Sequence, residues 1–308
     1  MMRIGLVTGE YPPMEGGVGA FTQELAKALA EQGHFVAIFT HREARAGYVK
    51  RSDDRARALL EPIELSFAEL YTRGRRWWWG EMDLIAEWVL RYELDVVNIQ
   101  YQAAAYNMRV PAINWLPWRL RRLTRVVVTY HDLRTPYLWP KAGRLRPFVV
   151  RQMGRMAAGA IVTNREDYEA LTAAVAVPVA EIPIGSNVMV HEVGVERVAT
   201  VRRELGVPEG GALLAYFGFL NRSKGADRLL AALAEMGEDV HLVFIGGRTG
   251  ASDPDNNRAF FEEIDGQIEA LGLGERVHWT GFVADEAVSA YLEAAEVVVL
   301  PYRDGVSL

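Results

Sequence analysis

Short apolar runs alternate along the chain with stretches in which apolar residues recur at helical spacing. Residues 4–7 form the first run and predict a buried parallel strand. After a loop rich in glycine and proline, apolar residues recur every three or four positions, at Phe21, Leu25, Ala28 and Leu29. Gly33 ends this predicted helix, and residues 35–40 predict the next strand. The chain therefore opens with a strand–loop–helix–strand unit.

The same alternation continues to residue 190. Apolar runs predict further strands at residues 62–67, 94–100, 126–130, 160–163 and 182–183. Helices are predicted at residues 77–92, 149–158 and 167–174. Strands separated by helices indicate an α/β fold with a parallel, doubly wound sheet and right-handed crossovers.

A second series of strands and helices follows a break in the pattern. Residues 192–205 are charged and helix-prone, and residues 206–211 (GVPEGG) are a cluster of helix and strand breakers. Strands are then predicted at residues 213–217, 241–245, 277–279 and 297–300, and helices at residues 226–236, 257–271 and 286–294. The predicted domains are residues 1–190 and 212–308, with residues 191–211 as a linker region. Because the second series has four strands, we expect the second domain to be incomplete in this sequence.

Composition and charge exclude several classes of protein. The chain has 308 residues, of which half are apolar, and its formal net charge is −6, which disfavours nucleic-acid binding by bulk electrostatics. It has no cysteine, which excludes disulfides, thiolate metal sites and cysteine nucleophiles. We expect no signal peptide, and no apolar run approaches the roughly 20 residues that a membrane span needs. The sequence therefore predicts a cytoplasmic protein.

The first loop carries candidate chemistry in Gly16, Gly17 and Gly19. Glycines between a strand and a helix N-terminus let a ligand approach the backbone where anions are favoured, so they predict a phosphate contact. The alternative is that they form only a tight turn. A dinucleotide fingerprint is disfavoured, because Thr22 stands in place of its third glycine and no acid ends the second strand.

Ligands of open parallel sheets bind beyond the carboxyl ends of the strands. In the first predicted domain these ends carry Gln100, Tyr101, His131, Asp132, Asn164, Gly185 and Asn187, together with the glycine loop. In the second they carry residues 218–224, 246–248 and 281–283, with Arg303 and Asp304. Arg222 and Lys224 lie between a strand and a helix, where they are either diphosphate ligands or solvated loop charges. His131 is either a donor to a reacting group or an ordinary satisfied histidine.

Several motifs in one order carry a family resemblance. They are YPP-EGG-G, VVVTYHD, IPIGSN, FGF-(x)4-KG, FIGG, TGFV and LPYRDGVS, and they span the chain from Arg3 to Ser307. In this order they resemble glycosyltransferase family 4. The resemblance implies a GT-B architecture, in which two Rossmann-like domains face each other across a cleft. It also implies a retaining, metal-independent transfer of a sugar from a UDP- or GDP-sugar, with no cofactor, to an acceptor held by the N-terminal domain.

The resemblance also implies roles for particular residues. His131 would contact the transferred sugar and Asp304 would be the first acid of a pair that contacts the donor sugar. The remaining residues with implied roles are Gly16, Gly17, Gly218, Arg222 and Lys224 at the donor phosphates, the backbone at Phe282 and Val283 at the base, and Tyr101 and Asn187 on the acceptor side. The chain departs from the family pattern at Phe219, where an arginine is common, and the second acid of the pair would follow Leu308. We therefore expect an impaired donor site in this chain.

A basic stretch interrupts the acidic composition. Residues 109–155 hold eleven arginines and lysines and one acid, Asp132, with Trp115, Trp118 and Trp139 among them, and residues 73–79 (RGRRWWW) form a similar cluster. The alternatives are an exposed face over core tryptophans and a surface that docks on anionic lipid or on a lipid-linked acceptor. Nucleic acid is disfavoured, since no binding motif accompanies the charge.

The preferred interpretation is a cytoplasmic GT-B glycosyltransferase that transfers a hexose-type sugar, peripheral on the inner membrane face where it docks. A carbohydrate or a lipid-linked molecule is the expected acceptor. One alternative is a relative that binds a sugar nucleotide or glycan without turnover. The other is a nucleotide-sugar epimerase, for which Asp132 and Asp304 are the candidate acids.

Overall fold

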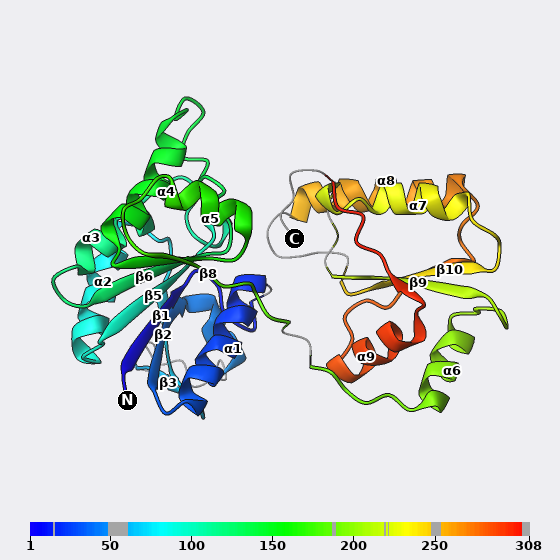
Figure 1. The fold of residues 1–308 in the computed structure, drawn as a ribbon, viewed down its shortest axis with the longest axis horizontal. Coiled ribbons are helices and arrows are strands. Elements are labelled where there is room, and N and C mark those ends of the chain that lie inside the picture. The colour runs from blue at the N-terminus through cyan, green and yellow to red at the C-terminus, as the bar shows by residue number, and fades with distance from the viewer. Residues whose placement is uncertain are drawn as a thin grey trace. The chain divides into compact units, whose positions relative to one another are not determined.

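The computed structural model describes residues 1–14, 16–48, 61–186, 189–218, 220, 222–247 and 254–303. The chain folds into two compact units, Met1–Asn187 and Val188–Leu308, each with its own sheet and core (Figure 1). The sequence pattern predicts that the first domain ends at residue 190.

The first unit is built on an eight-stranded sheet in the order β3-β4-β2-β1-β5-β6-β7-β8. All neighbours pair in parallel except β3 and β4, which are antiparallel. The strands are β1 (Arg3–Thr8), β2 (Phe35–His41), β3 (Ile63–Glu64), β4 (Glu69–Gly74), β5 (Val96–Tyr101), β6 (Arg125–Tyr130), β7 (Gly159–Val162) and β8 (Val179–Glu181).

Helices cover both faces of this sheet. They are α1 (Gly17–Glu31), α2 (Trp79–Arg91), α3 (Leu116–Leu120), α4 (Leu145–Met156) and α5 (Arg165–Thr172), with 3-10 turns η1 (Arg42–Gly47), η4 (Ala103–Ala105) and η5 (Ile113–Trp115). Leu6 of β1 packs into the core beneath α1, whereas the next residue, Val7, packs into the core beneath α2, α3 and α4. The strands read as continuous apolar runs because both faces are buried.

The second unit has a parallel sheet in the order β11-β10-β9-β12. Its strands are β9 (Ala212–Phe217), β10 (Val240–Ile245), β11 (Val277–Trp279) and β12 (Val297–Val298). Its helices are α6 (Val195–Glu204), α7 (Ala226–Ala234), α8 (Pro254–Ala270) and α9 (Asp285–Ala294), with a 3-10 turn η6 (Arg222–Lys224) before α7. Figure 1 shows α7 and α8 over one face of the sheet and α6 and α9 over the other.

The predicted α/β class and doubly wound pattern are confirmed, and the differences concern individual elements. The single edge strand predicted at residues 62–67 is the short β3, and β4 beside it was not predicted. The prediction of a strand at residues 182–183 is wrong, because β8 spans Val179–Glu181 and Ile182 is 54% exposed. The range predicted as a linker contains α6, whose Val201 is fully buried in the second core.

Within the described residues, no helix is both long and apolar enough to cross a bilayer.

Candidate functional site

The carboxyl ends of the parallel strands of the first unit meet at one edge of its sheet. The register pairs Thr8 of β1 with Gln100 of β5, and Gln100 with Thr129 of β6. The segments that follow these strands therefore lie side by side. They include the glycine loop after β1 and His131 after β6.

His131 is held by the neighbouring strand β5. Its N–H donates to the carbonyl of Tyr101 at 2.9 Å, and its ring Nε2 lies 2.9 Å from Oε1 of Gln100. The Gln100 amide is oriented by its own donation to Oδ1 of Asn98 at 3.0 Å, so its oxygen faces the ring. Because an amide oxygen can only accept, Nε2 carries the hydrogen.

The environment keeps His131 neutral. Burial lowers the pKa of His131 to about 4, and the ring of Phe21 from α1 packs edge-on at 4.9 Å between centroids. Its Nδ1 has no partner among the described residues. At neutral pH the side chain is therefore a fixed hydrogen-bond acceptor at Nδ1 and carries no charge.

A carboxylate from the glycine loop already occupies the N-terminus of α1. Glu10 Oε1 accepts hydrogen bonds from the backbone N–H groups of Val18 at 3.1 Å and Gly19 at 3.3 Å. Burial raises the pKa of Glu10, while these two hydrogen bonds act in the opposite direction. An internal anion thus takes the position for which the sequence predicted a phosphate.

Gly16 and Gly17 differ in the space that a side chain would have at each position. A Cβ on Gly16 would lie 2.0 Å from Oε1 of Glu10, so this glycine makes room for the internal carboxylate. A Cβ on Gly17 would have no neighbour within 4 Å. Gly17 is therefore the position that leaves open space for a ligand.

Tyr101 is a core residue, and its predicted contact with an acceptor is corrected. The side chain is 1% exposed, and its hydroxyl accepts a hydrogen bond from Nδ2 of Asn114 at 3.0 Å. Burial raises the pKa of Tyr101 to about 12. A side chain so enclosed cannot touch an acceptor. The other predicted acceptor-side residue, Asn187, lies outside the described residues, as does Asp304.

A pocket of about 330 Å³ opens beside the glycine loop, beyond the ends of β1, β2 and β4. Its lining includes Gly9, His41, Arg75, Arg76, Trp78 and Asn107. The sequence shows the two arginines only as part of a basic and aromatic cluster and does not indicate a site. Their convergence with His41 depends on the pairing of β2 with β4, and β4 was not predicted.

In the second unit, the segment between β9 and α7 carries the predicted donor residues. Gly218 has a φ of 118°, which side-chain-bearing residues rarely adopt. Gly225 has a φ of 74°, and a Cβ there would lie 2.0 Å from the carbonyl oxygen of Pro301. The turn η6 lies between these two glycines and leads directly into α7.

The two cations of η6 contact different partners. Arg222 forms an ion pair with Glu263 of α8, and 64% of its side chain is exposed. Lys224 Nζ lies 3.8 Å from the ring centroid of Tyr302. The structure therefore brings these residues onto one turn but not onto a common partner.

An acid also lies at the start of α7. Asp227 forms an ion pair with Arg303. Burial opposes ionisation of Asp227, but the hydrogen bond and charge of Arg303 prevail and lower its pKa. The sequence does not indicate this pair, because the two residues are far apart along the chain.

The loop between β11 and α9 presents an aromatic side chain. Phe282 is 77% exposed, whereas its neighbour Val283 packs at the edge of the core beneath α9. The loop is fixed to the end of β10, since Gly281 bridges Gly246 and the N–H of Gly246 donates to Oγ1 of Thr280 at 3.2 Å. An exposed ring on a fixed loop is suited to stacking on a planar ligand.

No cluster of three or more potential metal-ligating His, Asp or Glu side chains occurs in the part of the chain that the structure describes.

Family models match both units. The model for Glycosyltransferase Family 4 matches residues 15–187, which is more than half of the chain, and the model for Glycosyl transferases group 1 matches residues 198–307. The chain belongs to glycosyltransferase family 4. The resemblance stated from the motifs is thereby confirmed, and the chain is placed in a family of transferase enzymes.

Individual relatives extend over nearly the whole chain. The alpha-monoglucosyldiacylglycerol synthase of Streptococcus pneumoniae is 24% identical over 97% of this chain and 65% of its own length. The D-inositol 3-phosphate glycosyltransferase of Corynebacterium jeikeium is 30% identical over 97% of this chain and 75% of its own. This chain thus spans about two thirds to three quarters of the length of these relatives.

Solved structures show the same fold. A sucrose-phosphate synthase from Thermosynechococcus elongatus superposes with a TM-score of 0.70 at 23% identity, covering 98% of this chain and 76% of that one. Anabaena HepE, solved in complex with UDP and glucose, gives a TM-score of 0.67 at 19% identity over 97% and 73% of the two chains. The predicted GT-B fold with two Rossmann-like domains is confirmed.

Proposed function

We propose that the full-length protein transfers a hexose-type sugar from a UDP- or GDP-sugar to an acceptor, with retention of configuration. The observation that carries the proposal is the turn η6, which places Arg222 and Lys224 between a strand end and the N-terminus of α7. Cations at such a terminus favour a diphosphate. The proposal is further supported by family membership and by the UDP-glucose complex of the structural neighbour HepE.

Residues of each unit would then have a distinct task. Arg222 and Lys224 would leave Glu263 and Tyr302 to neutralise the diphosphate, which gains charge as the glycosidic bond breaks. Phe282 would lie against the base. His131, neutral and fixed by Gln100, would accept a hydrogen bond from the transferred sugar. The proposed reaction uses no metal and no cofactor.

Thermal unfolding in the presence of nucleotides tests the donor assignment. A nucleotide at a hundred times its dissociation constant should raise the free energy of unfolding by about 2.7 kcal/mol. UDP or GDP should stabilise the chain, and Lys224→Ala should lose this effect. Arg228→Ala removes an exposed cation from α7 and should keep it. Stabilisation by NAD alone would overturn the proposal, and so would a longer form of the protein that none of UDP, GDP, ADP and their sugars stabilises.

The stereochemistry has its own test. NMR of the first-formed product should show the same anomeric configuration as the donor sugar. Inversion would contradict retention, and nucleotide binding without any product would favour the alternative of a binding protein.

We also propose that the first unit docks on an anionic bilayer, which would place it on the inner face of the cytoplasmic membrane. Four aromatic side chains in or next to α3 and α4 are about half exposed, namely Trp118, Tyr137, Trp139 and Phe148. The guanidinium groups of Arg121 and Arg146 lie 5.0 and 4.9 Å from the ring centroids of Trp118 and Tyr137. Aromatic rings paired with cations are suited to the headgroup region.

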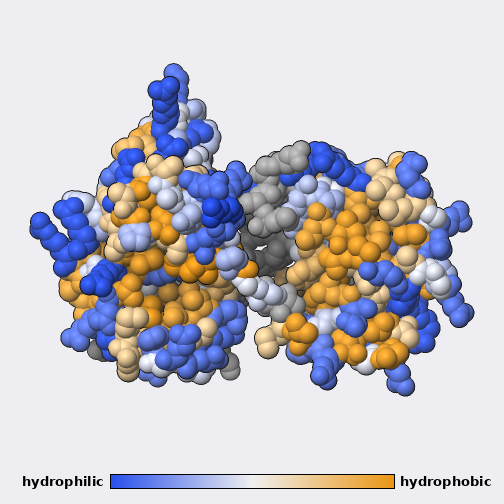
Figure 2. All heavy atoms as spheres, viewed as in Figure 1, coloured by the Kyte–Doolittle hydropathy of each residue, from blue (hydrophilic) through white to orange (hydrophobic). Residues whose placement is uncertain are grey.

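The shape of this region supports the docking proposal. Figure 1 shows the chain between β6 and α4 extending beyond α4, and Figure 2 shows hydrophilic residues over its tip. Sedimentation with vesicles is the test. The chain should bind vesicles that contain phosphatidylglycerol and not those of phosphatidylcholine alone, and Trp118→Ala/Trp139→Ala should weaken this binding. Equal binding to both vesicles would reject an electrostatic role.

A further inference from the structure

The turn that follows β4 has a backbone fixed from both sides. Oε1 of Glu81 accepts hydrogen bonds from the N–H groups of Arg75 and Arg76, each at 2.7 Å. The carbonyl of Arg75 accepts from Nε2 of His41 at 2.8 Å, and the carbonyl of Arg76 accepts from Nδ2 of Asn107 at 2.8 Å. All four polar backbone groups of the two arginines are therefore satisfied, by residues from three different segments of the chain.

Trp77, the next residue, anchors this turn in the core. It is 5% exposed, and its ring packs edge-on against Tyr106 at 4.8 Å and Phe39 at 6.2 Å between centroids. Its φ is 51°, a conformation that a bulky residue adopts only when its surroundings hold it there. The core packing of Trp77 thus determines the shape of the turn.

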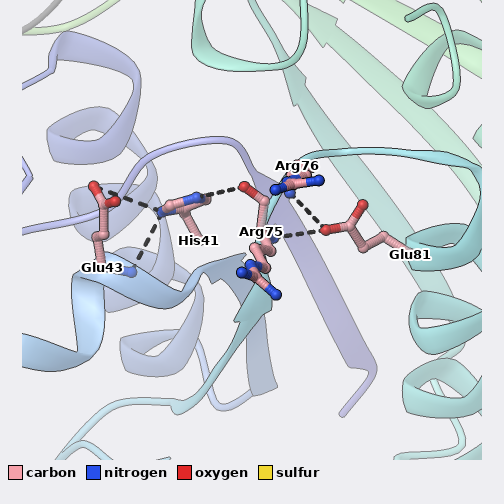
Figure 3. Close-up of polar contacts among 5 residues, drawn as sticks. All are labelled: His41, Glu43, Arg75, Arg76 and Glu81. Atoms are coloured by element: carbon pink, nitrogen blue, oxygen red, sulfur yellow. Dashed lines mark hydrogen bonds and ion pairs between the residues drawn. The ribbon is translucent and has the colours of Figure 1, made fainter.

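The two guanidinium groups have no partner in the part of the chain that the structure describes. Both arginines are exposed, and among the described residues neither side chain has a hydrogen bond or an ion pair. Figure 3 shows this arrangement, since the dashed lines that reach Arg75 and Arg76 end at backbone atoms. The carboxylate of Glu81 accepts from the backbone of the two arginines, and the carboxylate of Glu43 lies against His41. Two unpaired cations on a fixed turn favour an anion that bridges them.

Both arginines line the pocket of about 330 Å³ beside the glycine loop, together with Asn107 and the half-exposed ring of Trp78. Among its described lining residues there is no acid. The pocket lies at the same edge of the first sheet as His131, because it opens beyond the ends of β1 and β2. A molecule held there by an anionic group would extend along the edge where His131 lies.

We propose that this pocket binds the oxyanion of a phosphorylated acceptor, with Arg75 and Arg76 as the anion ligands. That the bound molecule is the sugar acceptor rests on the proposed function, whereas binding of an oxyanion in this pocket does not. A sugar phosphate and a phospholipid headgroup both supply this chemistry. The guanidinium groups of Arg75 and Arg76 would bind the phosphate oxygens through their positive charge and paired N–H donors. Trp78 would pack on the sugar ring or acyl chain that carries the phosphate.

Calorimetric titration of the full chain with glucose 6-phosphate, inorganic phosphate and glucose tests the proposal. The two phosphates should bind and glucose should not. Arg75→Gln/Arg76→Gln should weaken phosphate binding by about tenfold or more, because charge-assisted hydrogen bonds are lost. Arg75→Lys/Arg76→Lys should weaken it less, since the charges remain.

The control is Arg91→Gln/Arg228→Gln, which removes two positive charges from exposed arginines outside the pocket. It should bind glucose 6-phosphate as the unaltered chain does. Measurable binding of glucose that is as tight as that of glucose 6-phosphate would overturn the proposal. Equal affinity of the pocket variant and the control for glucose 6-phosphate would also overturn it.

Binding of the unaltered chain and of Arg75→Gln/Arg76→Gln to vesicles identifies the source of the oxyanion. Loss of binding to phosphatidylglycerol vesicles in the pocket variant, with no binding of glucose 6-phosphate by the unaltered chain, would assign the pocket to a lipid headgroup. Binding of glucose 6-phosphate that depends on the arginines, with vesicle binding unchanged in the variant, would assign it to a soluble ester. Absence of both effects would refute the proposal.

The same variant separates this inference from the proposed function. Stabilisation by UDP or GDP depends on η6 and should persist in Arg75→Gln/Arg76→Gln. If no nucleotide stabilises the chain but glucose 6-phosphate still binds through the arginines, the donor assignment fails and the anion pocket stands.

Discussion

At Gly16 the need for glycine comes from the protein rather than from a ligand. A Cβ would displace the Glu10 carboxylate, and Val18 and Gly19 would lose their acceptor. Gly16→Ala should therefore lower the free energy of unfolding by about 1 kcal/mol, the usual cost of losing a helix cap. Urea denaturation measures this difference.

Two variants show whether the cost acts through Glu10. Gly17→Ala adds a methyl group in open space and should leave stability nearly unchanged. In a Glu10→Ala background, Gly16→Ala should cost much less, because the two changes remove the same interaction. Additive effects would show that Gly16 has another role.

The burial of His131 predicts a dependence of stability on pH. The unfolded chain takes up a proton near pH 6.5, whereas the folded chain does so near pH 4. Between these values the unfolded state binds more protons, so the free energy of unfolding falls as the pH is lowered, by up to about 3 kcal/mol. His131→Gln should show a shallower loss between pH 7 and pH 4.5. An imidazole resonance of His131 that titrates near pH 6.5 would contradict the burial argument.

The sequence placed some of these residues correctly and others not. His131 was found because it directly follows an apolar run that ends a strand. Its partner Gln100 is 31 residues away, and only the register of β5 with β6 brings them together. Tyr101 was placed on the rim by the same rule, but side chains alternate along a strand, and Tyr101 points into the core.

At the scale of elements, Glu81 connects the turn after β4 to α2. It accepts from Arg75, Arg76 and Trp78, so it both caps the helix and fixes the arginines of the pocket. Glu81→Ala should lower the free energy of unfolding by about 1 kcal/mol, because α2 loses its N-terminal cap. It should also weaken glucose 6-phosphate binding, although Glu81 does not line the pocket.

Glu87→Ala provides the matched control, since Glu87 is exposed on the same helix and has no hydrogen-bond or ion-pair partner among the described residues. It should change stability by less than about 0.5 kcal/mol. Phosphate binding by Glu81→Ala that equals the control would show that the turn keeps its shape without this acid.

Most strands were predictable because both faces of each sheet are buried, which leaves long apolar runs in the sequence. β4 was missed because charged residues, Glu69 and Arg73, interrupt its short buried stretch. The helix α6 was read as part of a linker because its exposed face is highly charged. Its contribution to the core depends on Val201, a single fully buried residue of the helix.

At the scale of the whole molecule, the two proposed ligands belong to different units. Seven of the eight tryptophans precede residue 140, and the eighth, Trp279, lies in β11 of the second unit. Trp279 is partly buried and stacks on Phe244 at 4.3 Å between ring centroids, so its fluorescence should report unfolding of that sheet. Trp279→Phe leaves a fluorescence signal from the first unit alone.

Ligand binding should therefore shift different parts of the unfolding curve. The fluorescence of Trp279 is obtained as the difference between the unaltered chain and Trp279→Phe. UDP or GDP should raise the midpoint temperature of the unfolding transition that this fluorescence reports. Glucose 6-phosphate should raise the midpoint temperature of the unfolding transition that Trp279→Phe still reports. Each unit has its own core, so a ligand of one unit stabilises that unit first. A single transition moved equally by both ligands would contradict this division, because it would mean that the two units unfold as one.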